Sequence, residues 1–262
     1  MNLIELTNSI VVCQDRSYYQ VNMVCVHLGS ELVFIDTCTD IKLAKEFRKS
    51  MEKKYNQKEG TLIITHANRD HFNAISAFNG FPVFFSEAFI ERVKQYRVST
   101  KIMQILLQAQ TFSEEITFGS KDHKLLFRYV GGHTDDSIYG FYPSEKIIIA
   151  GDNLISNMPQ YFPFTDTDLK KWINCLKIWE QLDVEKFICG HGGIVGKNHV
   201  IKVRTFFENL YDVLVNSMEK NLVIEEILTR ADLPRYFEED PDEIINPSIQ
   251  FMTATNLTVF QV

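Results

Sequence analysis

The strongest structural signal in this chain is the segment Thr65-His66-Ala67-Asn68-Arg69-Asp70-His71. It places two imidazoles and one carboxylate within seven residues, directly after an apolar run at residues 62–64. His and Asp side chains hold Zn²⁺ in proteins, and the same set also suits iron or manganese. The segment therefore predicts a metal site just past the end of a buried strand.

Three more candidate ligands have the same setting, because each follows an apolar run and stands beside a glycine: His133, Asp152 and His191. A buried strand fixes the backbone while the loop after it stays open to substrate. Glycine lets the chain turn sharply and come close to an ion. We expect the three side chains to meet the first segment at one metal centre, each just past the end of a strand.

On these residues the chain resembles the metallo-β-lactamase-fold hydrolase superfamily, including its glyoxalase-II-like and lactonase-like branches. Its five sequence marks occur here in the family's order: Asp36, the segment 66–71, His133, Asp152 and His191. The resemblance runs over about residues 21–193. It implies an α/β fold, namely an αβ/βα four-layer sandwich, followed here by a helical C-terminal extension.

The resemblance also implies two adjacent metal sites. The first would use His66, the residue at position 68 and His133. The second would use Asp70, His71 and His191, with Asp152 bridging the two.

Position 68 departs from the family motif H-x-H-x-D-H, because Asn68 replaces the second His. An amide oxygen is a weaker ligand than imidazole, so we expect the first site to bind metal weakly. The second site should hold one ion tightly, with one or two ions per chain overall. Zinc is the expected ion, and iron and manganese are the alternatives. Asn68 itself is either a weak ligand or a hydrogen-bond donor to a substrate oxygen.

The function that the resemblance implies is hydrolysis of a small ester, thioester or lactone by a metal-held hydroxide. A bound cation lowers the pKa of its water from about 15.7 towards 7 and polarises the substrate carbonyl. Asp70 is the expected catalytic residue, which orients the water and passes its proton to the leaving group. Without a second metal, His66 and His133 would donate hydrogen bonds to the oxyanion. Tyr161, in an aromatic loop, is the candidate substrate contact.

Two other functions stay open. A catalytically silent member of the fold could bind a metabolite or a partner protein, and the loss of an imidazole at position 68 fits that reading. An iron-dependent redox member is the third candidate, although the carboxylate that di-iron relatives carry at position 68 is absent here. Turnover of a thioester panel would separate the hydrolase from the silent protein, and tightly bound iron would favour the third.

Composition limits the partners. The chain has 262 residues, 45% hydrophobic and 23% charged, which is ordinary globular usage. A net charge of −7 disfavours nucleic acid, so a small molecule is the expected partner. We expect a cytoplasmic protein without membrane association, because no leader-like segment or long apolar stretch is present. The oligomeric state does not follow from the sequence.

The five cysteines lack C-x-x-C spacing, so we expect packing residues rather than a zinc ribbon or a disulfide framework. Periodicity and turn residues predict the main elements. Strands are expected at about 9–14, 21–27 and 31–36, and helices at 41–55, 72–78, 86–110, 168–182 and 199–217. Residues 1–198 should form the metallo-β-lactamase-like domain, and residues 199–262 a helical extension packed on it.

Overall fold

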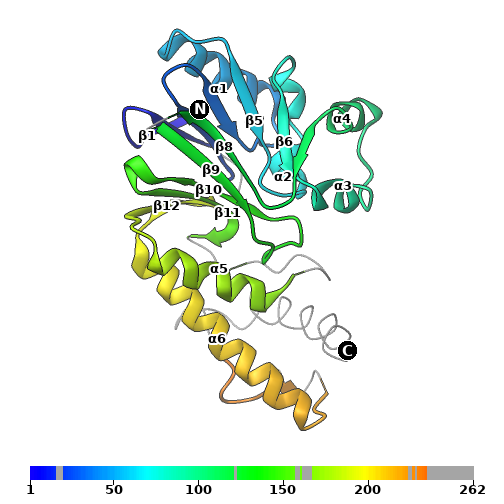
Figure 1. Cartoon of the computed structure of the whole chain (residues 1–262). Helices are drawn as coiled ribbons and strands as arrows, with labels where there is room; N and C mark the ends of the chain where they lie inside the picture. Colours follow the sequence, from blue (N-terminus) through cyan, green and yellow to red (C-terminus); the bar gives the residue numbers. More distant parts are fainter. Residues whose placement is uncertain are drawn as a thin grey trace.

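Two β-sheets lie face to face in the computed structural model, and helices cover the outer face of each (Figure 1). The structure describes residues 1–15, 20–120, 123–156, 160, 167–223, 226–227 and 229–234. The first sheet has, in spatial order, the strands β1 (Asn2–Glu5), β2 (Ile10–Gln14), β3 (Asn22–His27), β4 (Leu32–Ile35), β5 (Gly60–Ile63), β6 (Val83–Ser86) and β7 (Gln110–Phe112).

The second sheet has the spatial order β13 (Ile194–Val195), β12 (Lys186–His191), β11 (Ile147–Ile155), β10 (Ile138–Tyr142), β9 (His123–Tyr129) and β8 (Glu115–Ser120). Both sheets are mixed. Strands β1 to β4 pair antiparallel and β4 to β7 pair parallel. In the second sheet β11 and β12 form the parallel pair.

The helices complete four layers. The first sheet carries α1 (Ile41–Lys54), α2 (Arg69–Phe72), a 3₁₀ turn at Ile75–Phe78, α3 (Ala88–Val93) and α4 (Thr100–Leu106). The second sheet carries α5 (Leu169–Gln181) and α6 (Lys197–Glu219), which lie side by side in Figure 1. A 3₁₀ turn at Pro143–Glu145 joins β10 to β11. The predicted αβ/βα sandwich is thereby confirmed.

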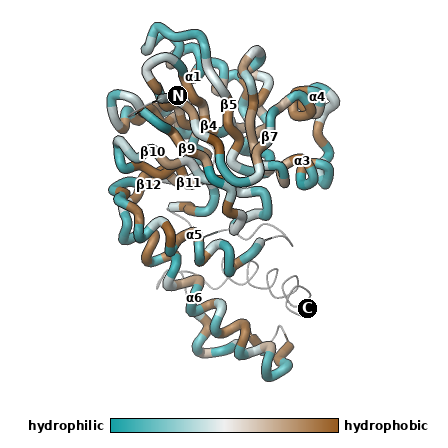
Figure 2. The backbone as a smooth tube through the Cα atoms, in the orientation of Figure 1, coloured by the Kyte–Doolittle hydropathy of each residue, from teal (hydrophilic) through white to brown (hydrophobic). Residues whose placement is uncertain are grey.

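The apolar strands explain this layering, because both of their faces are buried. Side chains alternate between the faces of a strand. In β2, Ile10 and Val12 pack between the two sheets, in the cluster that also holds Phe127. Val11 and Cys13 face the helical layer instead. Figure 2 shows the resulting apolar strands inside a more polar helical layer.

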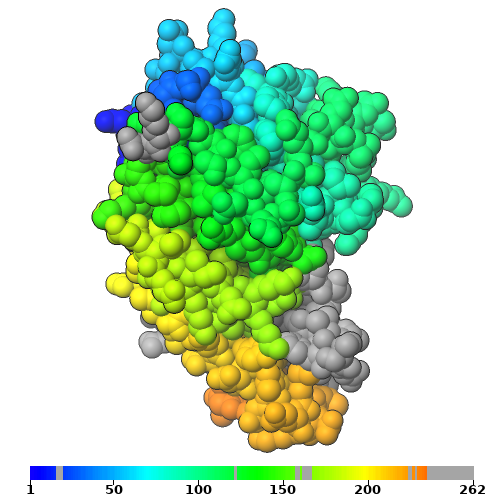
Figure 3. Space-filling view, viewed as in Figure 1, coloured from blue at the N-terminus to red at the C-terminus, as the bar shows by residue number. Residues whose placement is uncertain are grey.

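A third core cluster fixes α5 and α6 on the second sheet. Trp172 and Trp179 of α5 are fully buried there, together with Phe207 and Leu210 of α6. The far end of α6 forms the lower tip of the molecule in Figure 3. The domain boundary at residue 198 stays a prediction, and residues 235–262 of the predicted helical extension lie outside the described residues.

Two helix predictions need correction. The helix expected at 72–78 starts earlier and is only the single turn α2. It ends before Ala74, because the N–H of Ala74 donates to the Cys38 carbonyl at 2.9 Å. The long helix expected at 86–110 is two short helices. Ser99 begins α4 as an N-cap that accepts from Ile102 N at 3.3 Å, and Gln110 already pairs with β6 in the first sheet.

Within the described part of the chain, no helix combines the length and the apolar composition that crossing a bilayer requires.

The cysteines give a direct test of this packing. All five are buried and free of disulfides. Burial raises the pKa of the Cys13 and Cys189 thiols to about 12, and that of Cys38 to about 11. Because the thiolate is the reactive form, we expect the folded protein to resist Ellman's reagent at about pH 8. All five thiols should react in guanidinium chloride. Rapid labelling of the folded protein would contradict this core.

Candidate metal centre

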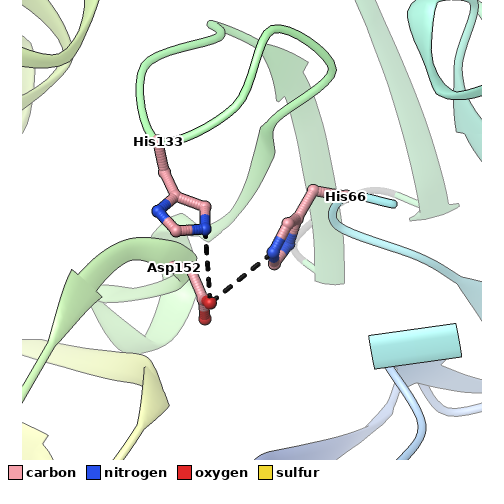
Figure 4. Close-up of side chains that lie close together, drawn as sticks. All are labelled: His66, His133 and Asp152. Carbon is pink, nitrogen blue, oxygen red and sulfur yellow. Dashed lines mark ion pairs between the residues drawn. The ribbon is translucent and has the colours of Figure 1, made fainter. Parts of the chain in front are cut away.

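The predicted ligands converge beside the inter-sheet core, although they come from both sheets. They form two groups, and the ligand atoms of each group lie within 4.8 Å of one another. The first group, hereafter the first cluster, is His66, His133 and Asp152. The second cluster is Asp70, His71 and His191. Figure 4 shows the three side chains of the first cluster pointing toward one another from separate segments.

The first cluster is fully enclosed, since its three side chains are at most 4% exposed. Nε2 of His66 and Nε2 of His133 each lie 3.5 Å from Oδ2 of Asp152. Among the described residues, His66 Nε2 has no hydrogen-bond partner. A buried polar atom left in this state costs about 1–3 kcal/mol. A cation between these atoms would satisfy it, so the donor set fits a metal ion.

The tautomer of His66 follows from its neighbours. Thr65 Oγ1 donates to Asp36 Oδ2 at 2.7 Å, because the carboxylate is an acceptor. The same hydroxyl lies 3.0 Å from His66 Nδ1 and must accept there, so Nδ1 carries the proton. When its ring is neutral, His66 therefore points an unprotonated Nε2 into the cluster, as a metal ligand does.

The second cluster has shorter contacts. Nε2 of His71 lies 3.2 Å from Nε2 of His191 and 3.2 Å from Oδ1 of Asp152. His191 Nε2 lies 3.1 Å from Asp152 Oδ2 and 3.3 Å from Asp70 Oδ2. Asp152 therefore lies close to ligand atoms of both clusters, and the bridging role that the resemblance implies for it stays a prediction. His71 Nδ1 contacts Asp36 Oδ2 at 2.8 Å, which leaves Nε2 to face the cluster.

Electrostatics also favour a cation here. Burial opposes protonation of His71, but Asp152, Asp36 and Asp70 together raise its pKa well above the ordinary value. Burial likewise opposes ionisation of Asp152, yet the imidazoles of His191, His71 and His66 hold its pKa well below the usual range. His133 differs, since burial lowers its pKa well below 6.5. Ionised carboxylates and a neutral imidazole are the forms that bind metal.

Asp152 and His191 correct one expectation, because they lie within β11 and at the end of β12 rather than beyond the strands. The pairing of β11 with β12 shifts register between Ile149 and Gly151 and again before Ile155. Such bulges re-aim side chains within a sheet. Gly190 is required beside them, since a Cβ there would stand 1.9 Å from Asp152 Oδ1.

Asn68 does not offer its amide oxygen to the first cluster. Its Oδ1 accepts from Arg92 Nη2 at 3.2 Å, and its Nδ2 lies 3.1 Å from His133 Nε2. In this arrangement His133 Nε2 accepts a hydrogen bond, and neutral His66 presents a bare nitrogen. In these neutral forms, neither ring offers an N–H from Nε2 to a substrate oxyanion. The arrangement therefore disfavours the expected role of His66 and His133 as hydrogen-bond donors to the oxyanion.

Several supporting residues were missed from the sequence. Asp36 was recognised as a family mark, but its contacts with Thr65 and His71 were not foreseen. Asp136 is fully buried and accepts from Ala67 N at 2.7 Å and Thr134 Oγ1 at 2.8 Å, which ties the two ligand loops together. No signal in the sequence distinguishes it from its exposed neighbour Asp135. The predicted contact Tyr161 lies outside the described residues.

The three remaining histidines make contacts outside the two clusters. His27 stacks on Tyr55 with ring centroids 4.4 Å apart. His123 Nδ1 contacts the Tyr142 hydroxyl at 3.0 Å, and His199 Nε2 donates to the Ile155 carbonyl at 2.9 Å.

Removing the negative charge of Asp36 should weaken metal binding. In Asp36→Asn, the group that orients His71 and Thr65 loses its charge, and loss of such a partner typically lowers metal affinity about 10- to 100-fold. Chelator competition with zinc measures the effect. Asp40→Asn is the control, because Asp40 caps α1 through Lys42 N and Leu43 N and an amide oxygen also caps helices. Equal affinities in both variants would contradict the role of Asp36.

Comparisons with known proteins agree with this geometry. Residues 82–191 match the family model described as the metallo-beta-lactamase superfamily. The metallo-beta-lactamase type 2 of Bacillus sp. (strain 170) is 26% identical over 159 residues, which are 58% of this chain. The match spans only 59% of that relative's length.

Solved structures show the same fold. The metallo-beta-lactamase from Pontibacter korlensis has a TM-score of 0.67 at 19% identity, covering 79% of this chain and 99% of that one. The DIM-1 metallo-beta-lactamase has a TM-score of 0.65 at 18% identity, covering 79% and 96%. The fold, the matched segment and the two ligand clusters agree with one another, so this chain is similar to the metallo-β-lactamase superfamily and has its fold.

Proposed function

We propose that this protein is a hydrolase that uses one tightly held metal ion to cleave a small ester, thioester or lactone. The observation that carries the proposal is the second cluster with Asp152. There His191 Nε2 lies within 3.3 Å of two carboxylates and 3.2 Å of His71 Nε2. Carboxylate oxygens and imidazole nitrogens this close together repel one another unless protons or a cation lie between them.

The ligands would be Asp70, His71, His191 and Asp152. Two nitrogens and two carboxylates suit zinc, and iron or manganese are compatible with the same set. When bound, such an ion lowers the pKa of water and polarises a substrate carbonyl. The residues of the chain then have to hold the substrate and move one proton.

Asp70 is best placed to move that proton. Its side chain is 31% exposed, whereas His71 and Asp152 are at most 4% exposed. A carboxylate at the open side of the cluster can accept a proton from the attacking water and return it to the leaving group. His71 is held by Asp36 through Nδ1, the ring nitrogen that faces away from the cluster, so it acts as a fixed support.

The relatives bear on the substrate. The curated relative is named a beta-lactamase, and a β-lactam is a cyclic amide with a carbonyl of related geometry. A β-lactam therefore belongs in the substrate panel beside esters, thioesters and lactones. The acidic net charge of −7 favours small substrates over nucleic acid.

The zinc-loaded protein should hydrolyse at least one member of this panel, and removal of the metal should abolish the reaction. Asp70→Ala should reduce kcat by about 10²- to 10⁴-fold, the usual contribution of a positioned acid or base. Asp135→Asn is the matched control, since Asp135 is an exposed carboxylate in the loop that carries His133. Equal turnover with and without metal would refute the mechanism. No turnover on any substrate would favour the silent binding protein.

Metal stoichiometry tests the role of position 68 separately. Asn68→His restores an imidazole, so metal content should rise from about one towards two ions per chain. Elemental analysis after dialysis measures this. An unchanged ratio would show that position 68 does not limit the first site.

A further inference from the structure

A buried arginine lies behind the first cluster. Arg92 of α3 is 4% exposed, and its Nε lies 3.5 Å from Oδ1 of the fully buried Asp136. Its Nη2 donates to Asn68 Oδ1 and to the Tyr96 hydroxyl, each at 3.2 Å. A guanidinium in this position is pre-ordered by several partners, so it can hold the Asn68 side chain in one orientation.

The orientation of the Asn68 amide follows from these contacts. Arg92 is a donor and cannot accept, so the atom of Asn68 that faces it must be the oxygen. The Tyr96 hydroxyl also donates to this oxygen, at 3.5 Å. A flipped amide would set N–H against N–H at Arg92. The amide nitrogen therefore faces His133.

The amide nitrogen of Asn68 donates to the nitrogen of His133 that would have to bind a metal ion. Asn68 Nδ2 lies 3.1 Å from His133 Nε2, and the same Nε2 faces Asp152 in the first cluster at 3.5 Å. An imidazole nitrogen has one lone pair. While His133 Nε2 accepts from Asn68, it cannot also bind a cation.

The helix start supports this reading. Asn68 is the N-cap residue of α2, where an Asn oxygen ordinarily accepts from the first backbone N–H groups. Within the described residues, its side chain makes no capping hydrogen bond. The oxygen accepts from Arg92 instead, so Asn68 makes the contact with the arginine in place of the usual capping hydrogen bond.

We propose that Arg92 is a positioning residue that holds Asn68 as a hydrogen-bond donor to His133, and that this contact lowers the affinity of the first cluster for metal. The inference rests on the proposed function in taking the second cluster as the tight site. A metal entering the first cluster has to break the Asn68–His133 hydrogen bond. Asn68 is then a competitor for His133, not a poor ligand.

Asn68→Ala separates these two roles by the sign of its effect. It removes the donor and frees His133 Nε2, so the affinity for the second zinc equivalent should rise about three- to tenfold, the value of one neutral hydrogen bond. If Asn68 were a ligand, the affinity would fall. Chelator competition measures the second equivalent. Adding His133→Ala to this variant should abolish the gain, which places the second ion in the first cluster.

Arg92→Met tests the arginine itself. The amide loses its anchor, and the second equivalent should again bind more tightly. Arg69→Gln removes an equal charge from the neighbouring residue, whose guanidinium contacts the Arg97 carbonyl at 2.9 Å, and should leave that affinity within about twofold.

Arg92→Met leaves Asp136 buried without its cation, so circular dichroism should first establish that the variant is folded. If it is not folded, Asn68→Ala decides alone. An unchanged or lower affinity in Asn68→Ala overturns the proposal. These readouts need no substrate, so failure of the hydrolysis assay would not be confused with failure of this inference.

Discussion

The carboxylate of Asp36 is the interaction on which the metal centre depends. It accepts from Thr65 N and Thr65 Oγ1, each at 2.7 Å, and it contacts His71 Nδ1 at 2.8 Å. Through the hydroxyl it sets the tautomer of His66, and directly it sets that of His71. One side chain thus aims Nε2 of one histidine into each cluster, and in the neutral form of each ring this Nε2 is the nitrogen without a proton. Asp36 has a left-handed φ of 60°, a conformation that Asp tolerates better than most residues.

The sandwich makes this arrangement possible. Asp36, His66 and His71 follow strands of the first sheet, whereas His133, Asp152 and His191 belong to the second. The ligands meet because the inner faces of the sheets pack through residues such as Val12 and Phe127. Metal affinity is therefore coupled to the integrity of the inter-sheet core, since a shift of one sheet against the other would separate the two halves of each cluster.

Much of this centre was predictable because it is local in sequence. The apolar runs, glycines and ligand types predict the strands and the six candidate ligands, whereas the four layers and the grouping of the ligands were implied by the family resemblance. The end of α2 was not predictable, because the Cys38 carbonyl and the Thr37 hydroxyl, from a distant segment, accept from the N–H of Ala74. The bulge at Asp152 depends on the register between β11 and β12, which the sequence of either strand alone does not define.

Asn68 shows the same limit at the site itself. The sequence identifies the lost imidazole, and two roles for the amide remain open at that level. The choice depends on Arg92, which lies 24 residues away on a short helix that the sequence predicts as part of a longer one. The contact between the buried Arg92 and the Asn68 amide is a tertiary contact that decides which amide atom faces the cluster, and no periodicity or motif in the sequence predicts it.

The central claim is that one ion is bound tightly, in the second cluster. Anomalous diffraction at the zinc edge, on crystals of protein loaded with one equivalent, tests it most directly. The account predicts a single strong peak bounded by Asp70, His71, His191 and Asp152. A stronger peak between His66 and His133 would contradict it.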